Sequence, residues 1–139
     1  MIILDTNVIS AMIRHPTEDS VLRWLNSQDR GSLWTTSITV FELETGLRRL
    51  APGQKQEWLE ERINEMVLNS FRGRVLSFEV EAARASARIG ADLRSQGRSI
   101  EFRDAMIAGI AIVFGVPLAT GNTRHFYDIG IPLVNPWEF

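Results

Sequence analysis

The stretch that decides the fold of this protein is Ile2–Ile9, which reads IILDTNVI. Its apolar residues Ile2–Leu4 predict a short buried strand, and the polar triplet Asp5–Asn7 is typical of a turn into a helix. Ligands of helix-covered parallel sheets bind at the carboxyl ends of the strands, and Asp5 lies at that end. Asp5 is therefore a candidate functional residue, although the pattern also allows Asp5 or Asn7 to serve only as a helix cap.

The rest of the chain alternates between strands and helices. The sequence predicts further strands over Ser32–Thr36, Arg74–Phe78, Pro117–Thr120 and Pro132–Val134. It predicts helices over Val8–Ile13, Thr17–Gln28, a segment capped by Ser37 or Thr39 and ending at Leu50, Gln54–Ser70, Val80–Gln96 and Arg103–Phe114. Short strands that are apolar on both faces indicate a parallel sheet of four to five strands covered by helices, an α/β fold. A length of 139 residues predicts one domain, 1–139.

The amino-acid composition limits the metals and catalytic groups that this protein can use. Cysteine is absent and only His15 and His125 supply imidazole, so a bound metal must be held by oxygen, which favours Mg²⁺ or Mn²⁺. Fourteen arginines stand against the single lysine Lys55, which excludes P-loop and Schiff-base chemistry unless Lys55 serves. We expect a cytoplasmic protein without a membrane partner, because there is no cysteine, no secretory signal and no apolar run of membrane-spanning length.

Two further carboxylates lie near the starts of predicted helices. The positions three, four and seven residues after Asp104 are all apolar, so Asp104 faces the interior, where an unpaired charge is costly. The alternative is a first-turn aspartate that the helix dipole favours. Glu42 lies beside an apolar stripe, with Gly46 one turn later leaving space above it. Alternatively, Glu42 has a structural role and forms a capping box with Thr39 at the start of the helix.

Taken together, the three carboxylates predict a metal site. Asp5, Glu42 and Asp104 can converge on one edge of the sheet, where their charges repel and a divalent cation is the usual compensation. Mg²⁺ held by one or two carboxylates, with substrate phosphate completing its shell, is the arrangement used in phosphodiester chemistry.

At these residues the sequence resembles the PIN-domain nucleases, and among them the VapC-like toxins of bacterial toxin–antitoxin pairs. Four pieces in family order and spacing carry the resemblance, and they cover nearly the whole chain. They are Ile3–Ser10 (ILDTNVIS), Thr36–Leu43 (TSITVFEL) with Gly46, Asp104–Ala108 (DAMIA), and Leu118–Asn122 (LATGN) leading into His125-Phe126 and Asn135–Trp137 (NPW).

The resemblance implies a three-layer α/β/α fold and RNA cleavage that depends on Mg²⁺ or Mn²⁺. It carries Asp5, Glu42 and Asp104 over as the acidic core, with Asp5 and Asp104 binding the metal and Glu42 orienting or deprotonating a metal-activated water that attacks phosphorus. The fourth family position, often aspartate, is Asn122 here, which leaves one or two metals open, and Thr120 matches the family's hydroxyl donor. A cognate antitoxin, an RNA substrate and a homodimer are the implied partners.

Other residues and functions are weighed against this reading. His125 is interpreted as structural, and Trp137 as packing on the sheet. Five arginines are candidates for an RNA path: Arg48, Arg49, Arg94, Arg98 and Arg124. A haloacid-dehalogenase-like phosphatase would need a second aspartate at position 7 and a downstream lysine, and Asn7 with Lys55 as the single lysine supplies neither. A response-regulator receiver is disfavoured by the missing lysine too. The remaining alternative is a catalytically weak or inactive PIN-like module that binds RNA or a partner.

Overall fold

The computed structural model describes residues 1–14 and 19–139. His15 and the first two residues of the predicted helix Thr17–Gln28 lie outside the described residues. No helix in the described part of the chain is long and apolar enough to cross a membrane.

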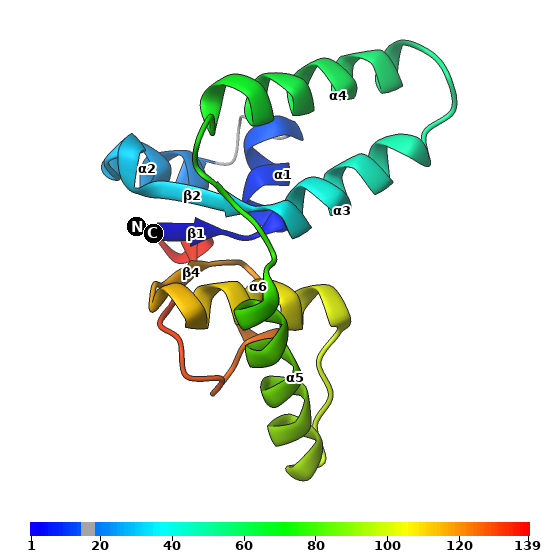
Figure 1. The fold of residues 1–139 in the computed structure, drawn as a ribbon. Helices are drawn as coiled ribbons and strands as arrows, with labels where there is room; N and C mark the ends of the chain where they lie inside the picture. Colours follow the sequence, from blue (N-terminus) through cyan, green and yellow to red (C-terminus); the bar gives the residue numbers. More distant parts are fainter. Residues whose placement is uncertain (15–18) are drawn as a thin grey trace.

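Five parallel strands form the centre of the molecule, as the apolar segments predict (Figure 1). They are β1 (Ile2–Leu4), β2 (Leu33–Thr36), β3 (Val75–Leu76), β4 (Leu118–Ala119) and β5 (Leu133–Val134). Their order in the sheet is β3-β2-β1-β4-β5, and every neighbouring pair is parallel. The predicted fold class, a parallel sheet between helical layers, is confirmed.

Helices cover both faces of this sheet (Figure 1). One face carries α1 (Thr6–Arg14), α2 (Asp19–Ser27), α3 (Ser37–Arg48) and α4 (Gln54–Glu65), and the other carries α5 (Val80–Ser95) and α6 (Phe102–Phe114). A π-helical turn, η2 (Met66–Ser70), continues α4, so the predicted helix Gln54–Ser70 has the right bounds. Short 3-10 turns complete the elements: η1 (Arg30–Ser32), η3 (Thr123–His125) and η4 (Pro136–Glu138).

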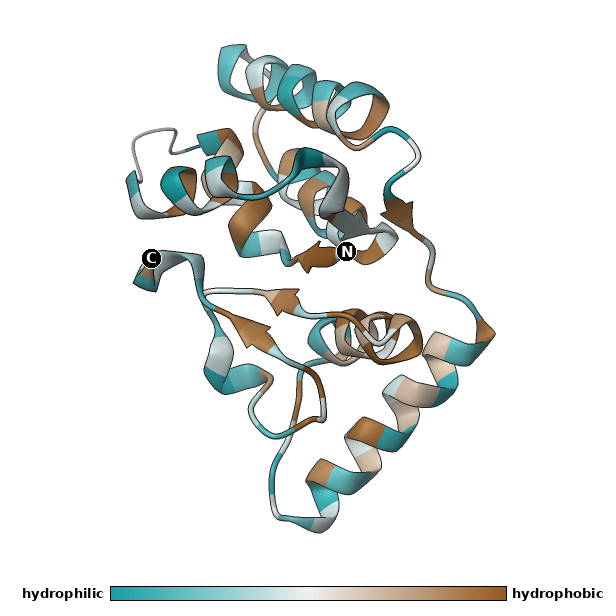
Figure 2. Ribbon diagram, turned by 90° about the vertical axis from the view of Figure 1, so that its left-hand side faces the viewer, coloured by the Kyte–Doolittle hydropathy of each residue, from teal (hydrophilic) through white to brown (hydrophobic). Residues whose placement is uncertain are grey.

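Strand alternation divides the core into two clusters. Neighbouring residues of a strand point to opposite faces, so Leu4 packs with α1–α4 while Ile3 packs with α5 and α6. Both side chains are fully buried. Figure 2 shows the result, with apolar strands at the centre and a hydrophilic outer side on α4. The double burial explains why β1 is apolar without a polar alternation.

The start of α3 differs from the prediction. Thr36, rather than Ser37 or Thr39, is the N-cap, and its Oγ1 accepts a hydrogen bond of 3.1 Å from the backbone N–H of Thr39. Thr36 is also the last residue of β2, so the strand runs into the helix without a loop. This tight connection brings α3 to the carboxyl end of the sheet.

The strand order creates one place where a ligand can enter. From β1 the chain proceeds to β2 and β3 on one side, whereas β4 and β5 lie on the other side of β1. The connections on the two sides of β1 cover opposite faces of the sheet (Figure 1). A crevice lined by Asp5 and Asn122 lies where they part, at the carboxyl ends of β1 and β4. Asp5 follows β1 at this crevice, and Thr120 follows β4.

The contact between α5 and α6 generates a prediction about stability. A Cβ added at Gly109 of α6 would lie 2.1 Å from Ser86 Oγ and 2.5 Å from the carbonyl oxygen of Ala82, both on α5. We expect Gly109→Ala to lower the free energy of unfolding by about 1–3 kcal/mol, because the two helices must separate. Urea unfolding followed by circular dichroism measures this change.

The matched control is Gly90→Ala in α5, where an added Cβ meets no atom within 4 Å. This variant should gain about 0.5–1 kcal/mol, the usual preference of a helix for alanine over glycine. An equal gain in both variants would contradict the close packing of α5 on α6.

Candidate active site

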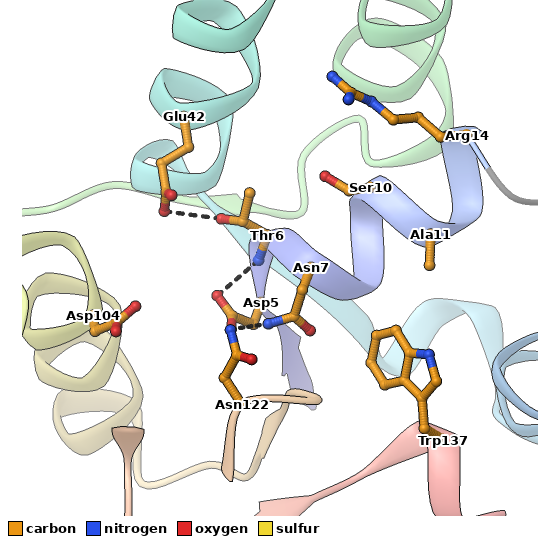
Figure 3. A pocket seen from close by; sticks show the side chains of 10 residues that line it. All are labelled: Asp5, Thr6, Asn7, Ser10, Ala11, Arg14, Glu42, Asp104, Asn122 and Trp137. Atoms are coloured by element: carbon orange, nitrogen blue, oxygen red, sulfur yellow. Dashed lines mark hydrogen bonds between the residues drawn. The ribbon is translucent and has the colours of Figure 1, made fainter. Parts of the chain in front are cut away.

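The carboxylate of Asp5 is buried and fixed by three donors. The side chain is 3% exposed. Its Oδ1 accepts a 2.7 Å hydrogen bond from the backbone N–H of Thr6, and its Oδ2 accepts 2.7 Å bonds from Asn7 Nδ2 and from Thr120 Oγ1. Figure 3 shows the bonds from Thr6 and Asn7. The carboxylate does more than cap α1, because two of its three donors are side chains.

Thr120 and Asn7 join the ends of β1 and β4. The Thr120 hydroxyl donates to Asp5 and accepts 3.0 Å bonds from Asn7 Nδ2 and the backbone N–H of Asn122. Asn7 Oδ1 in turn accepts a 3.0 Å bond from the backbone N–H of Gly121. Thr120 is therefore a positioning group behind Asp5, and Asn122 is held at the pocket by its own backbone.

Glu42 reaches the same place from α3. Its Oε1 accepts a 3.0 Å hydrogen bond from Thr6 Oγ1 (Figure 3). The capping box between Thr39 and Glu42 is wrong, because the N-cap of α3 is Thr36 and Glu42 lies in the second turn. Glu42 is therefore available to the site rather than committed to the backbone of its own helix.

Asp104 enters from the first turn of α6. Glu101 caps this helix by accepting bonds from the backbone N–H groups of Arg103 and Asp104 at 2.9 and 3.4 Å, so the Asp104 carboxylate is not needed there. The Asp104 side chain is 18% exposed, and its Oδ2 lies 2.9 Å from His125 Nδ1. His125, interpreted above as structural, thus contacts one of the candidate acids.

The three acids line one open pocket of about 430 Å³ (Figure 3). The pocket contains four of the five residues that the sequence assigns to catalysis, namely Asp5, Glu42, Asp104 and Asn122, while Thr120 lies behind Asp5. The remaining lining residues are Thr6, Asn7, Ser10, Ala11, Arg14 and Trp137. The structure therefore brings the predicted acids together at the predicted edge of the sheet.

Burial, together with repulsion from neighbouring carboxylates, raises the pKa of all three acids in the pocket. Burial raises the pKa of Asp5, and the charge of Asp104 adds to this shift, although the bonds from Thr120, Thr6 and Asn7 oppose it. Burial also raises the pKa of Glu42, and the charges of Asp5 and Asp104 add to this shift, while the bond from Thr6 and the charge of Arg103 oppose it. For Asp104, burial raises the pKa against the opposing hydrogen bond from His125.

The donor set fits a hard divalent cation. Carboxylate oxygens of Asp5 and Asp104, with the amide oxygen of Asn122 nearby, are ligands that Mg²⁺ and Mn²⁺ prefer, and a cation would relieve the repulsion. No three acidic or imidazole side chains converge on one metal position within residues 1–14 and 19–139. Two carboxylates completed by water are sufficient for Mg²⁺, which usually keeps part of its hydration shell.

The other predicted residues fall into two groups. Arg98 and Arg124 line a hollow beside Asp104 together with His125. Arg48, Arg49 and Arg94 line neither this hollow nor the acidic pocket. Trp137 packs on the end of β4 as predicted, since a Cβ added at Gly121 would lie 2.9 Å from its ring, and it also forms a wall of the acidic pocket.

Sequence reasoning overlooked three polar contributors on α1. Thr6 holds Glu42, Asn7 holds Asp5, and Arg14 lies at the far end of the pocket. The sequence contains a signal for Arg14. Ser10, Ala11 and Arg14 lie three, four and seven residues after Asn7, so all four share one face of the helix.

Comparison with known proteins agrees with this geometry. The model of the PIN domain family matches residues 2–132, and this chain belongs to that family. The chain is 36% identical to the VapC ribonuclease Y4jK of Sinorhizobium fredii and 35% identical to the toxin FitB of Neisseria gonorrhoeae, in each case over 99% of both chains. A crystal structure of FitAcB from Neisseria gonorrhoeae superposes with a TM-score of 0.91 at 34% identity, covering 100% of both chains. The predicted resemblance to VapC-like PIN domains is confirmed.

The raised pKa values generate a prediction about the metal-free protein. A carboxyl group whose pKa is higher in the folded chain binds more protons there than in the unfolded chain, so it makes the free energy of unfolding fall as the pH rises. In EDTA at neutral pH, Asp104→Asn should therefore unfold at a temperature equal to or higher than the wild type. The advantage should shrink as the pH falls into the carboxyl range, where both side chains are neutral.

Differential scanning calorimetry measures this, with Asp92→Asn on the exposed side of α5 as the control. A marked destabilisation by Asp104→Asn at neutral pH, with Asp92→Asn unchanged, would contradict the repulsive character of the acidic pocket.

Proposed function

We propose that this PIN-domain protein is an endoribonuclease that requires Mg²⁺ or Mn²⁺ and acts as the toxin of a toxin–antitoxin pair. The observation that carries the proposal is the convergence of Asp5, Glu42 and Asp104 on one pocket at the crevice of the sheet. The relative named VapC ribonuclease and the relative named toxin, each aligned over nearly the whole chain, support the RNA-cleaving activity and the biological role.

Each acidic residue has a distinct role in this proposal. Asp5 and Asp104 hold the cation, with Thr120 and Asn7 fixing the oxygen atoms of Asp5 and His125 orienting Asp104. The cation supplies Lewis acidity and a more acidic water when bound. Glu42, anchored by Thr6, accepts the proton of the attacking water, a role that suits a carboxylate whose pKa lies above its ordinary value.

Two arginine side chains next to the acidic pocket provide positive charge that attracts RNA. Arg98 and Arg124 line the hollow that shares Asp104 with the pocket, together with Glu101 and His125, and these two arginines are the proposed contacts for RNA phosphates. Arg98 is steadied there, because it donates a 2.8 Å hydrogen bond to the carbonyl oxygen of Tyr127 and stacks on that ring. The net charge of −2 is thus compatible with local attraction of RNA.

The cleavage assay tests the catalytic part of this proposal. Purified protein should cut RNA in Mg²⁺ or Mn²⁺, and EDTA should stop it. Asp104→Ala and Glu42→Gln should each lower the rate by about 100-fold or more, the scale expected for loss of a ligand or a general base. Both side chains are partly exposed rather than buried in the core, so both variants should fold.

Asp92→Ala serves as the matched acidic control and should keep the wild-type rate. Wild-type cleavage by Asp104→Ala would reject the assignment. Folded wild-type protein that binds RNA without cutting it would favour the inactive-module alternative.

An antitoxin would find two features to recognise. An arginine or lysine of the partner can pair with Asp5 and Asp104 and take the place of the cation. A mainly apolar hollow of about 210 Å³ lies between α1 and the α4–η2 helix, lined by Ile9, Met12, Ile13, Trp58, Met66 and Phe71 among others. A partner helix can dock in such a hollow, with Trp58 as an exposed anchor at its rim.

Growth of a bacterial host tests the toxin role. Induction of this chain alone should arrest growth, and Asp104→Ala should restore it, because the harm requires cleavage. Co-expression of the adjacent small gene product should also restore growth and suppress cleavage by the purified complex. Normal growth with folded, RNA-cutting protein would contradict the toxin role and leave the nuclease proposal intact.

We also propose a homodimer with two-fold symmetry. Among the apolar residues of α2 and α4, Trp24 and Leu59 are buried within this chain and Trp58 is exposed at the rim of the hollow described above. Further exposed apolar side chains lie near the starts of three helices at the carboxyl end of the sheet: Phe41 on α3, Val80 on α5 and Phe102 on α6. Pairing through this end would make the two acidic pockets share one groove.

A further inference from the structure

A second hollow lies beside the one that Arg98 and Arg124 form with Asp104. The same two arginines line both hollows, so they form the ridge between them. The second hollow has a volume of about 390 Å³, and its lining is completed by Thr123, Tyr127 and Leu133. A continuous surface therefore leads from Asp104, at the acidic pocket, across the two arginines to the ring of Tyr127.

The loop that carries Tyr127 is held by the core. Phe126 and Ile129, on either side of it, are buried in the cluster of α5 and α6 (Figure 1). Asp128 adopts the left-handed conformation, with a φ of 59°, at the turn between them. The Tyr127 side chain, in contrast, is 67% exposed. An exposed aromatic ring on an anchored loop loses little conformational entropy when a ligand stacks on it.

Arg98 occupies one face of the Tyr127 ring. Its backbone N–H donates a 2.9 Å hydrogen bond to the carbonyl oxygen of Leu93 at the end of α5, which fixes the start of the side chain. Its guanidinium donates a 2.8 Å bond to the carbonyl oxygen of Tyr127, and its Cζ lies 5.6 Å from the centre of the ring. Because the ring is still largely exposed, its other face is open to solvent.

The positive charge of the ridge is available to an anion. In the part of the chain that the structure describes, neither Arg98 nor Arg124 forms an ion pair with a carboxylate. Glu101 lines the first hollow, but its carboxylate binds the side chain and the backbone N–H of Arg103. Asp128, although next to Tyr127, lines neither hollow. Arginine beside an open aromatic face is the combination that binds single-stranded nucleic acid without regard to sequence.

Resting on the proposed nuclease function, we infer that Arg98, Arg124 and Tyr127 form a second RNA-binding site outside the acidic pocket. A base beyond the cleaved bond stacks on the open face of Tyr127, and Arg124 binds a phosphate that lies between this base and the reacting phosphate. Stacking requires a base that is free of its own partner. The site therefore favours RNA that is unpaired on one side of the cleaved bond.

The test separates binding from cutting. All variants carry Glu42→Gln, which removes the proposed base and leaves Asp5 and Asp104 in place. In Mg²⁺, the probe is a fluorescent pool of random-sequence single-stranded RNA, and the same pool annealed to its complement is the duplex. Fluorescence anisotropy gives the dissociation constant at several salt concentrations. Photo-crosslinking of a pool that contains 5-iodouridine, followed by mass spectrometry, locates the stacked base.

We expect the ring and the arginine to have different signatures. Tyr127→Leu should weaken single-strand binding about tenfold without changing the slope of log K against log salt, since stacking involves no phosphate. Tyr127→Phe should stay within about twofold of the parent protein. Arg124→Gln should reduce the slope by about 0.7, the value for one phosphate contact on a single strand. The crosslink should fall on Tyr127.

Two control variants match these changes elsewhere on the surface. Phe114→Leu alters an exposed aromatic residue at the opposite end of α6 from Asp104, and Arg84→Gln alters an exposed arginine of α5. Neither should change the affinity or the slope. On the duplex, Tyr127→Leu should bind as the parent protein does, because no base is free to stack.

Three results would overturn the inference. They are a Tyr127→Leu variant that matches Phe114→Leu in single-strand affinity, an equal loss of affinity for single strand and duplex, and no single-strand binding by the parent protein. In the first case, a weaker complex between Tyr127→Leu and the adjacent small gene product would assign this surface to a protein partner instead. None of these results decides the nuclease proposal, which is tested by cleavage with the wild-type Glu42.

Discussion

The rest of the site depends on the burial of Asp5 at the end of β1. The same residue serves the sheet and the site, because its backbone N–H donates a 2.9 Å bond to the carbonyl oxygen of Ala119 in β4 while its carboxylate is held by Thr6, Asn7 and Thr120. A displacement of β4 against β1 would therefore move the carboxylate. The active site is as rigid as the central strand pair that carries it.

In this arrangement, the carboxylates that the function needs lower the stability of the metal-free protein. Burial raises the pKa of Asp5, Glu42 and Asp104, so the charged form of each carboxylate is less favourable in the folded, metal-free protein than in the unfolded chain. Their supporting hydrogen bonds offset only part of this effect. Every buried polar side chain in the described part of the chain has a hydrogen-bond partner, so the unrelieved quantity in the pocket is charge. A cation supplies what the protein's own donors cannot.

The sequence predicted the strands and helices well because both faces of β1 are buried and the helices carry strong periodic and capping signals. It also predicted the acidic residues, since a carboxylate at the end of an apolar strand or on an apolar helix face is conspicuous. It could not show the contacts that join distant segments, such as Thr120 with Asp5, 115 residues apart, or His125 with Asp104. The N-cap of α3 was misplaced by one residue or three because Thr36, Ser37 and Thr39 can all cap a helix, and only the end of β2 selects Thr36.

The most direct test of the central claim is a crystal of this protein soaked in Mn²⁺, with the anomalous signal recorded at the manganese absorption edge. The account predicts a peak between the carboxylates of Asp5 and Asp104, on the side of the pocket that Asn122 and Glu42 line. The peak should be absent from Asp104→Asn crystals soaked in the same way. A peak elsewhere, or none in the wild type while Asp5 and Asp104 remain ordered, would contradict the claim that these residues form the metal centre of a nuclease.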